Sequence, residues 1–217
     1  MSNIKKLADS SFDTSKTVVI CGKGESLTKI HDADLTDKYI ACLNSATLFV
    51  DRADFLFVTD IERLDSLLKV ETDFSKIKNL ISPIQVHKNE KPSAVTYLDV
   101  AKKTKQYDLD IYTYCLQTQT MPDPPLDNID KFKFGPEVMY SSFICSLFWL
   151  THAGFRNFEM YGVGTNPKYA QKFIDNNDTG SLRKDKDLNP TPKEWFVVNC
   201  MTGISIMQRL GCSFKFN

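Results

Sequence analysis

Short apolar runs alternate along the chain with segments in which apolar residues follow helical spacing. The first run, Thr17–Cys21, is continuous and rich in β-branched residues, which is typical of a parallel strand buried on both faces. Comparable runs predict further strands at residues 39–43, 55–58, 78–82, 110–115, 157–161 and 212–216. Several of them end at glycine, asparagine or aspartate, so each predicted strand leads into a polar turn.

Helical patterns fill several intervals between the predicted strands. Tyr140–Ala153 is apolar on nearly all sides, which predicts a buried helix that ends at Gly154. Glu194–Leu210 predicts the last helix, and Gly211 ends it. Weaker patterns predict helices after the first and third strands, at Leu27, Ile30 and Leu35 and at Ile61, Leu64, Leu67 and Leu68. This alternation predicts an α/β fold: a Rossmann-like, doubly wound, mostly parallel sheet with helices on both faces.

The chain shows no linker or repeat that would divide it into several domains. We expect an N-terminal tail over residues 1–16 and one domain over residues 17–217. Prolines and aspartates between Gln117 and Phe134 predict a loop. The polar stretch 166–192 predicts a mobile lid, because long loops in compact domains often cover an active site.

Composition and charge narrow the class of protein. The 217 residues are 42% apolar and 25% charged, ordinary values that exclude a wholly disordered chain. Because 27 Lys and Arg balance 27 Asp and Glu, no strong overall field would attract nucleic acid, and we expect no such partner. The longest apolar run, Phe143–Leu150, is too short to span a bilayer, so we expect no membrane span.

The six cysteines and the N-terminal residues favour a cytoplasmic location. No two cysteines form a CxxC pair and most lie in apolar runs, so we interpret them as reduced, buried thiols. The first residues are polar and lack the apolar segment of a secretory signal. The three histidines show no metal-ligand spacing, so we expect no metal site.

The strongest candidate site is the turn Gly22-Lys23-Gly24-Glu25-Ser26, which follows the first predicted strand. Two glycines let the backbone approach an anion, the helix that follows offers free N–H groups, and Ser26 can cap that helix. Lys23 adds a positive charge. The alternative is a tight turn without a ligand. The sequence lacks GxxxxGK[ST] and a third glycine in reach, which disfavours a Walker A loop and a dinucleotide site.

Other polar residues follow the predicted strands, where ligands bind in doubly wound sheets. They are Asn44, Ser45, Asp60, Gly162, Thr165 and Asn166, together with Ser141 and Ser142 before the buried helix. Asn44 can bind a sugar or base edge, or simply end its strand. Asp60 can bind a ribose hydroxyl, act as a base, or cap a helix. Ser141 and Ser142 can donate to an anion or serve as a plain cap.

Thr17–Leu27 resembles the first strand and phosphate turn of the small bacterial sialyltransferases that decorate lipooligosaccharide, whose motif is roughly I-I-A-G-N-G-P-S-L. The same turn occurs in archaeal hydroxymethylpterin diphosphokinases and their relatives. Asn44 at the end of the second strand is similar to a nucleotide-contacting Asn of the family. Ser141-Ser142 with the apolar helix, Tyr161-Gly162 and the pair Tyr169-Ala170 follow in the family's order.

The resemblance implies a nucleotide-binding domain that performs a metal-independent, inverting transfer from CMP-sialic acid. The CMP-activated sugar is then a substrate, and no cofactor is implied. The glycine turn would cradle the CMP phosphate. Asn44 and Ser142 would hold the nucleotide or the donor sugar, and Tyr169 would steady the leaving phosphate.

Several positions depart from the family. Lys23 and Glu25 stand where the family has Asn and Pro, and no histidine follows His152 to act as the family's base. Glu194 or Asp60 could take that role. Two alternatives therefore stay open: a non-catalytic nucleotide or nucleotide-sugar binding protein, and a Mg²⁺-dependent diphosphokinase of the hydroxymethylpterin type. Neither the glycan acceptor nor the oligomeric state follows from the sequence.

Overall fold

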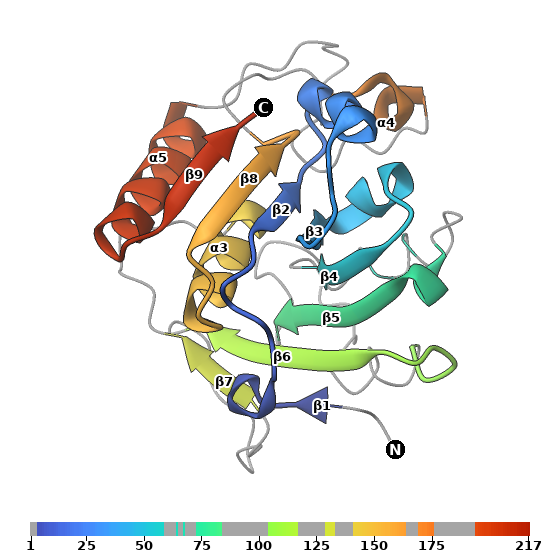
Figure 1. The fold of residues 1–217 in the computed structure, drawn as a ribbon, viewed down its shortest axis with the longest axis vertical. Helices are drawn as coiled ribbons and strands as arrows, with labels where there is room; N and C mark the ends of the chain where they lie inside the picture. The colour runs from blue at the N-terminus through green and yellow to red at the C-terminus, as the bar shows by residue number, and fades with distance from the viewer. Residues whose placement is uncertain are drawn as a thin grey trace.

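The computed structural model describes residues 4–58, 64, 67, 73–83, 104–116, 129–132, 141–163, 169–175 and 194–217. Within them the chain forms one nine-stranded sheet in which every strand pair is parallel, in the order β1-β6-β5-β4-β3-β2-β8-β9, with β7 also paired to β6 (Figure 1). The strands are β1 Ile4–Lys5, β2 Val18–Cys21, β3 Tyr39–Leu43, β4 Ala53–Phe57, β5 Ile77–Pro83, β6 Asp110–Leu116, β7 Ile129–Phe132, β8 Asn157–Tyr161 and β9 Ser213–Phe216.

Helices cover both faces of the sheet, as the sequence predicts. They are α3 Ser142–His152, α4 Gln171–Asp175 and α5 Glu194–Arg209, with the 3-10 helices η1 Leu7–Asp9, η2 Glu25–Asp32, η3 Asn44–Phe49 and η4 Phe74–Lys76. One buried cluster joins the strands to α3 and α5. A second cluster on the other face joins them to η2, η3, η4 and α4. The fold is therefore an α/β, doubly wound, Rossmann-like sheet.

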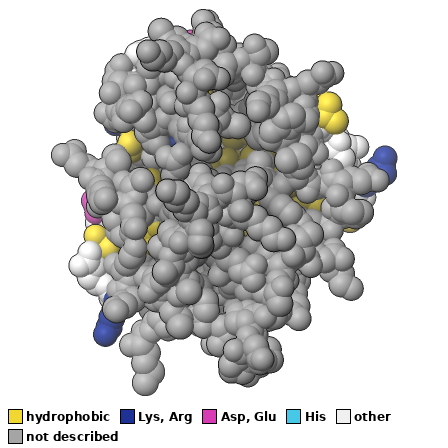
Figure 2. Space-filling model, turned by 180° about the vertical axis from the view of Figure 1, so that it is seen from behind, with side chains coloured by type: hydrophobic (Ala, Val, Ile, Leu, Met, Phe, Trp, Pro, Cys, Tyr) yellow, Lys and Arg dark blue, Asp and Glu magenta, His cyan; other side chains and the backbone are white. Residues whose placement is uncertain are grey.

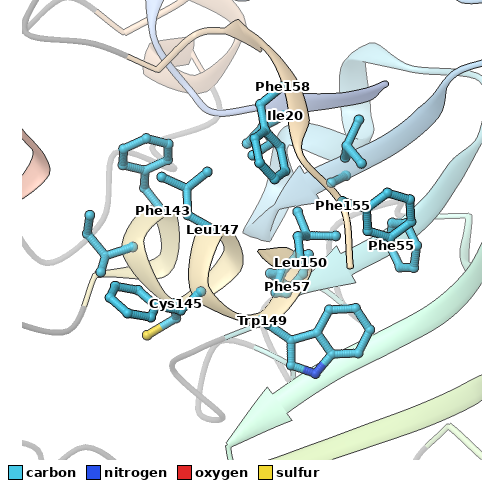
Figure 3. Packing of buried hydrophobic residues seen from close by; sticks show 14 of the residues in the cluster. Ile20, Phe55, Phe57, Phe143, Cys145, Leu147, Trp149, Leu150, Phe155 and Phe158 are labelled. Atoms are coloured by element: carbon cyan, nitrogen blue, oxygen red, sulfur yellow. The ribbon is translucent and has the colours of Figure 1, made fainter. Parts of the chain in front are cut away.

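Helix α3 forms the centre of the first cluster because its sequence is apolar on every side. Its residues from Phe143 to Thr151 are all buried. The Trp149 ring packs against the aromatic side chains of β4, with its centre 5.8 Å from that of Phe55 and 5.7 Å from that of Phe57 (Figure 3). The buried Ser146 hydroxyl donates to the Phe143 carbonyl at 2.7 Å, so this polar side chain is satisfied inside the helix.

On the side of the molecule opposite to Figure 1, described hydrophobic side chains reach the surface in a few separate places (Figure 2).

The predicted strands match the observed ones closely, and β3 and β8 have the predicted bounds. Two expectations need correction. The helix after β2 is a 3-10 helix, and its buried residues are Leu27 and Ile30 without Leu35. The predicted loop between Gln117 and Phe134 contains β7, which pairs with β6. Of the apolar pattern after the third strand, Leu64 and Leu67 lie in the described residues, and both are helical and buried.

The expected N-terminal tail is part of the fold from residue 4 onward. β1 pairs with β6, and the Lys5 ammonium lies 2.6 Å from the Asp110 carboxylate. Phe12 enters the aromatic cluster on the α3 face, with its ring centroid 5.0 Å from Phe55 and 6.2 Å from Trp149. The packing of Phe12 could not be predicted from the sequence, because the N-terminal segment is mostly polar and a single aromatic residue gives no periodic pattern.

The strand order places a topological switch point between β2 and β8. From β2 the chain adds β3, β4, β5 and β6 on one side, and later adds β8 and β9 on the other. In such sheets ligands bind beyond the carboxyl ends of the strands at this point. The turns after β2 and β8 are Gly22–Ser26 and Gly162–Val163. The fold therefore makes these two turns the first candidates for a binding site.

We expect Phe12→Ala to lower the free energy of unfolding by about 2–3 kcal/mol, because it removes an aromatic side chain from a packed cluster. Urea denaturation monitored by circular dichroism measures this loss. Ser11→Ala, at the exposed neighbouring position, serves as the control and should change stability by less than about 0.5 kcal/mol. Equal, small effects of both variants would show that residues 4–16 do not stabilise the sheet.

Candidate functional site

The glycine turn after β2 packs directly against the turn after β8. A Cβ on Gly22 would lie 2.3 Å from the Gly162 carbonyl oxygen, and one on Gly24 would lie 2.9 Å from it. The Gly22 N–H donates to the Tyr161 carbonyl and the Gly24 N–H donates to the Gly162 carbonyl, both at 2.8 Å. Glycine is therefore needed here for backbone-to-backbone contact, and these two N–H groups are used within the fold.

Ser26 also serves this contact, in a role different from the expected helix cap. The cap residue of η2 is Gly24, and no side chain caps the helix. The Ser26 hydroxyl instead accepts a hydrogen bond of 2.9 Å from the Gly162 N–H. Gly162 itself has a φ of +63°, a left-handed conformation that favours glycine. The two turns are thus joined by main-chain and side-chain bonds.

Tyr169 lies beside the glycine turn. It forms an isolated antiparallel bridge with Gly24, and the Ala170 N–H donates to the Lys23 carbonyl at 2.9 Å. Ala170 is buried and Phe173 in α4 is fully buried. The described part of the predicted lid, residues 169–175, is therefore packed against the sheet; the other residues of 166–192 lie outside the described ranges.

Two lysines flank an aromatic pair next to this turn. The Lys23 ammonium lies 5.5 Å from the centre of the Phe173 ring, and the Lys172 ammonium lies 5.2 Å from that of Phe49. The Phe49 and Phe173 ring centres are 5.1 Å apart. Cations over aromatic faces are held in place by the ring quadrupole. The arrangement gathers positive charge beside the turn. No pattern in the sequence indicates a role for Lys172, because its partner Phe49 is distant along the chain.

Asn44 and Ser142 are brought into contact from sites far apart in the chain. The Asn44 side-chain amide donates to the Ser142 hydroxyl at 3.2 Å. Asn44 has a φ of +52°, a left-handed conformation that costs a non-glycine residue free energy. Its side-chain carbonyl oxygen is buried and accepts no hydrogen bond from any described residue. Such a strained, incompletely satisfied polar group at the end of a strand is typical of a binding site.

The start of α3 completes the described edge. The Ser141 hydroxyl accepts a hydrogen bond of 3.2 Å from the Ile144 N–H, so Ser141 is the helix cap. Ser142 is the first helical residue, where the positive end of the helix dipole favours an anion. Ser45, which follows Asn44, is buried in η3. Among the described candidates, Ser142 and Asn44 therefore present polar atoms near the helix start.

Burial changes the acidity of two groups at the ends of the central strands. Burial, assisted by the Glu159 carboxylate, raises the pKa of Tyr161 at the end of β8. Its hydroxyl stays protonated at neutral pH. A hydrogen bond with Cys21, followed by burial, raises the pKa of Cys42 well above its ordinary value. The Cys42 thiol therefore stays protonated and acts as a small core side chain rather than as a nucleophile.

The remaining candidates lie outside the described part of the structure in whole or in part. Asp60, Thr165 and Asn166 are not among the described residues. Glu194 begins α5, and its backbone alone is described. Within the described ranges, no three His, Cys, Asp or Glu side chains lie close enough together to hold a metal ion. No described helix is long and apolar enough to cross a bilayer.

Comparisons with known protein families and with curated proteins find no match. The interpretation of the site therefore depends on its geometry and on the sequence resemblance.

We expect Gly22→Ala to lower the free energy of unfolding by about 2–3 kcal/mol, because the added Cβ would collide with the Gly162 carbonyl. Thermal and urea unfolding without ligand measure this loss. Gly211→Ala is the matched control: Gly211 has a φ of +83° but nothing within 4 Å of a Cβ, so it should lose about 1 kcal/mol. Equal losses would contradict the close contact between the two turns.

We expect Asn44→Gly to leave stability within about 1 kcal/mol, because relief of the left-handed strain offsets the lost bond to Ser142. Asn44→Ala keeps the strain and loses the bond, so it should unfold about 1 kcal/mol more easily than Asn44→Gly. Urea denaturation of the pair tests the conformation of Asn44. A more stable alanine variant would contradict a left-handed Asn44.

Proposed function

We propose that the protein is a sialyltransferase-like glycosyltransferase that binds a CMP-activated sugar at the carboxyl edge of the sheet, without a metal ion. The observation that carries this proposal is the contact between Asn44 and Ser142 beside the switch point, with one buried amide oxygen that no described residue satisfies. The sequence resemblance points to a CMP-activated sugar as the ligand, and the position of the Asn44–Ser142 contact at the carboxyl edge of the sheet supports the proposal.

In this proposal the described side chains bind and orient the donor. Asn44 and Ser142 hold the nucleotide or the donor sugar. Lys23 and Tyr169 stabilise the phosphate that leaves when an acceptor hydroxyl attacks the anomeric carbon. The acceptor must lose a proton in this step, and Asp60 or Glu194 is the proposed base.

One observation bears on how a phosphate would be held under any of the three functions. The turn uses two of its N–H groups within the fold, which favours phosphate recognition by side chains over a backbone cradle. A non-catalytic binding protein would use the same Asn44 and Ser142 contacts and would differ in lacking a base. A diphosphokinase needs carboxylates that bridge Mg²⁺ and phosphates, and its candidate Asp60 lies outside the described residues.

We expect CMP and CMP-sialic acid to raise the unfolding temperature, and UDP, NAD and ATP with Mg²⁺ to have no effect. A ligand at 100 times its dissociation constant stabilises the fold by about 2.7 kcal/mol, which a thermal-shift measurement detects. Lys23→Ala should weaken CMP binding about 10- to 100-fold, because it removes a charged partner of the phosphate. Lys29→Ala, at an exposed position of the following 3-10 helix η2, should bind like the parent protein.

The outcomes separate the three functions. A transferase should also hydrolyse CMP-sialic acid slowly without an acceptor, whereas a binding protein should not. Stabilisation by ATP with Mg²⁺ alone would favour the diphosphokinase. If no nucleotide stabilises the protein, or if Lys23→Ala and Lys29→Ala bind CMP equally well, the proposed site is refuted.

A further inference from the structure

The C-terminal unit of α5 and β9 carries the large hydrophobic side chains that are most exposed in the described chain. They are Val198, Met201, Leu210 and Phe216, each more than half exposed. The unit lies at one outer edge of the sheet, where β9 pairs with β8 alone (Figure 1). Two of them, Val198 and Met201, are three residues apart on α5 and therefore lie side by side on one face of this helix.

One side of α5 packs on the core and leaves the other side open. Gly203 permits close contact with α3, since a Cβ there would lie 2.3 Å from Cδ1 of Ile144. Ile204 and Met207, on the same side, are buried. The inner side of α5 therefore packs in the core, whereas the side chains of its outer side do not contribute to the core.

The outer side forms a stripe along α5. Val198 and Met201 are each 56% exposed, and Ser205 and Gln208 continue the stripe as exposed residues. The spacing of three, four and three residues keeps these positions on one line, as in the contact stripe of paired helices. Along this stripe the long Met201 side chain is followed by the small Ser205, so side chains of a second helix can fit between those of α5.

The charges of α5 indicate which second helix fits. Glu194 is its first residue and Arg209 its last, and no charged residue lies between them, although 25% of the whole chain is charged. Interface cores are depleted of charge in this way. If two copies of α5 run antiparallel, Glu194 of one copy lies beside Arg209 of the other. A two-fold axis between Met201 and Thr202 creates this pairing at both ends.

We propose that α5 is a dimerisation helix and that its outer stripe docks on the same stripe of a second copy of this chain. The two Met201 side chains meet near the two-fold axis, and Val198 of each copy packs against Ser205 of the other. The contact is isologous, as in most closed dimers. The proposed dimer does not require the function proposed for the carboxyl edge; the two proposals share Glu194, and in a dimer that pairs Glu194 with Arg209 the base of the proposed transferase is Asp60.

The length of α5 sets the strength of the dimer. Its 16 residues span about 24 Å, so one helix pair lies at the small end of specific interfaces. We therefore expect a reversible monomer–dimer equilibrium with a dissociation constant on the order of 10 µM. Sedimentation-velocity measurements on the full chain between about 1 and 300 µM cover that range.

Charge reversal tests the antiparallel arrangement directly. Glu194→Arg alone places like charges together at both ends, and so does Arg209→Glu alone, so each variant should dimerise at least about tenfold more weakly than the parent. An equimolar mixture of the two single variants should recover dimers, because the heterodimer restores an unlike pair at each end. Lys29→Glu, on η2, is the charge-change control and should dimerise like the parent.

Met201→Asp tests the centre of the stripe and should abolish the dimer. Far-UV circular dichroism and the unfolding temperature of each variant, measured at the lowest concentration, show that the monomer is folded. A parent protein that stays monomeric up to about 300 µM overturns the proposal. So does a mixture no more dimeric than its separate components, or a dimer that Met201→Asp leaves intact.

Discussion

The close contact between the turns after β2 and β8 is the constraint on which the rest of the structure depends. Gly22 and Gly24 approach the Gly162 carbonyl more closely than any side chain would allow. Two main-chain bonds and the Ser26 hydroxyl hold the contact. Because β2 and β8 lie on either side of the switch point, this contact joins the two halves of the sheet. It also fixes the edge along which Asn44, α3 and Tyr169 are arranged.

Two buried polar residues at opposite ends of the sheet, Asp54 and Asn44, differ in how fully their side chains are hydrogen-bonded. At the amino end of β4, buried Asp54 accepts hydrogen bonds from the Ile40 N–H, Arg52 and Lys78, so its charge is fully paired. Paired groups of this kind hold a fold together. At the carboxyl end of β3, Asn44 adopts a strained conformation and keeps a buried oxygen that no described residue satisfies. A residue that combines a strained backbone with a buried polar atom lacking a hydrogen-bond partner is typical of binding sites.

The sequence predicted the elements whose signal is local. Continuous β-branched runs located the central strands, and the apolar run around α3 located the buried helix. It could not predict features whose cause lies elsewhere in the chain. β1 and β7 are strands because β6 offers them a partner, and Phe12 is a core residue because aromatic rings from four distant segments surround it. Of the candidate site residues, Asn44 and Ser142 lie together at the carboxyl edge of the sheet, but the bond between them could not be predicted from the sequence because they are far apart along the chain.

The structural role of the glycines changes how the turn could hold an anion. A phosphate-binding turn ordinarily offers its free N–H groups, but Gly22 and Gly24 donate theirs to carbonyls of the neighbouring turn. In the proposed transferase, side chains must therefore supply much of the positive potential at this edge. Lys23, at a position where the resembling family has asparagine, is placed to do so, with Lys172 close by. In that proposal, the side-chain charge of Lys23 takes the part that free backbone N–H groups play in an ordinary phosphate-binding turn.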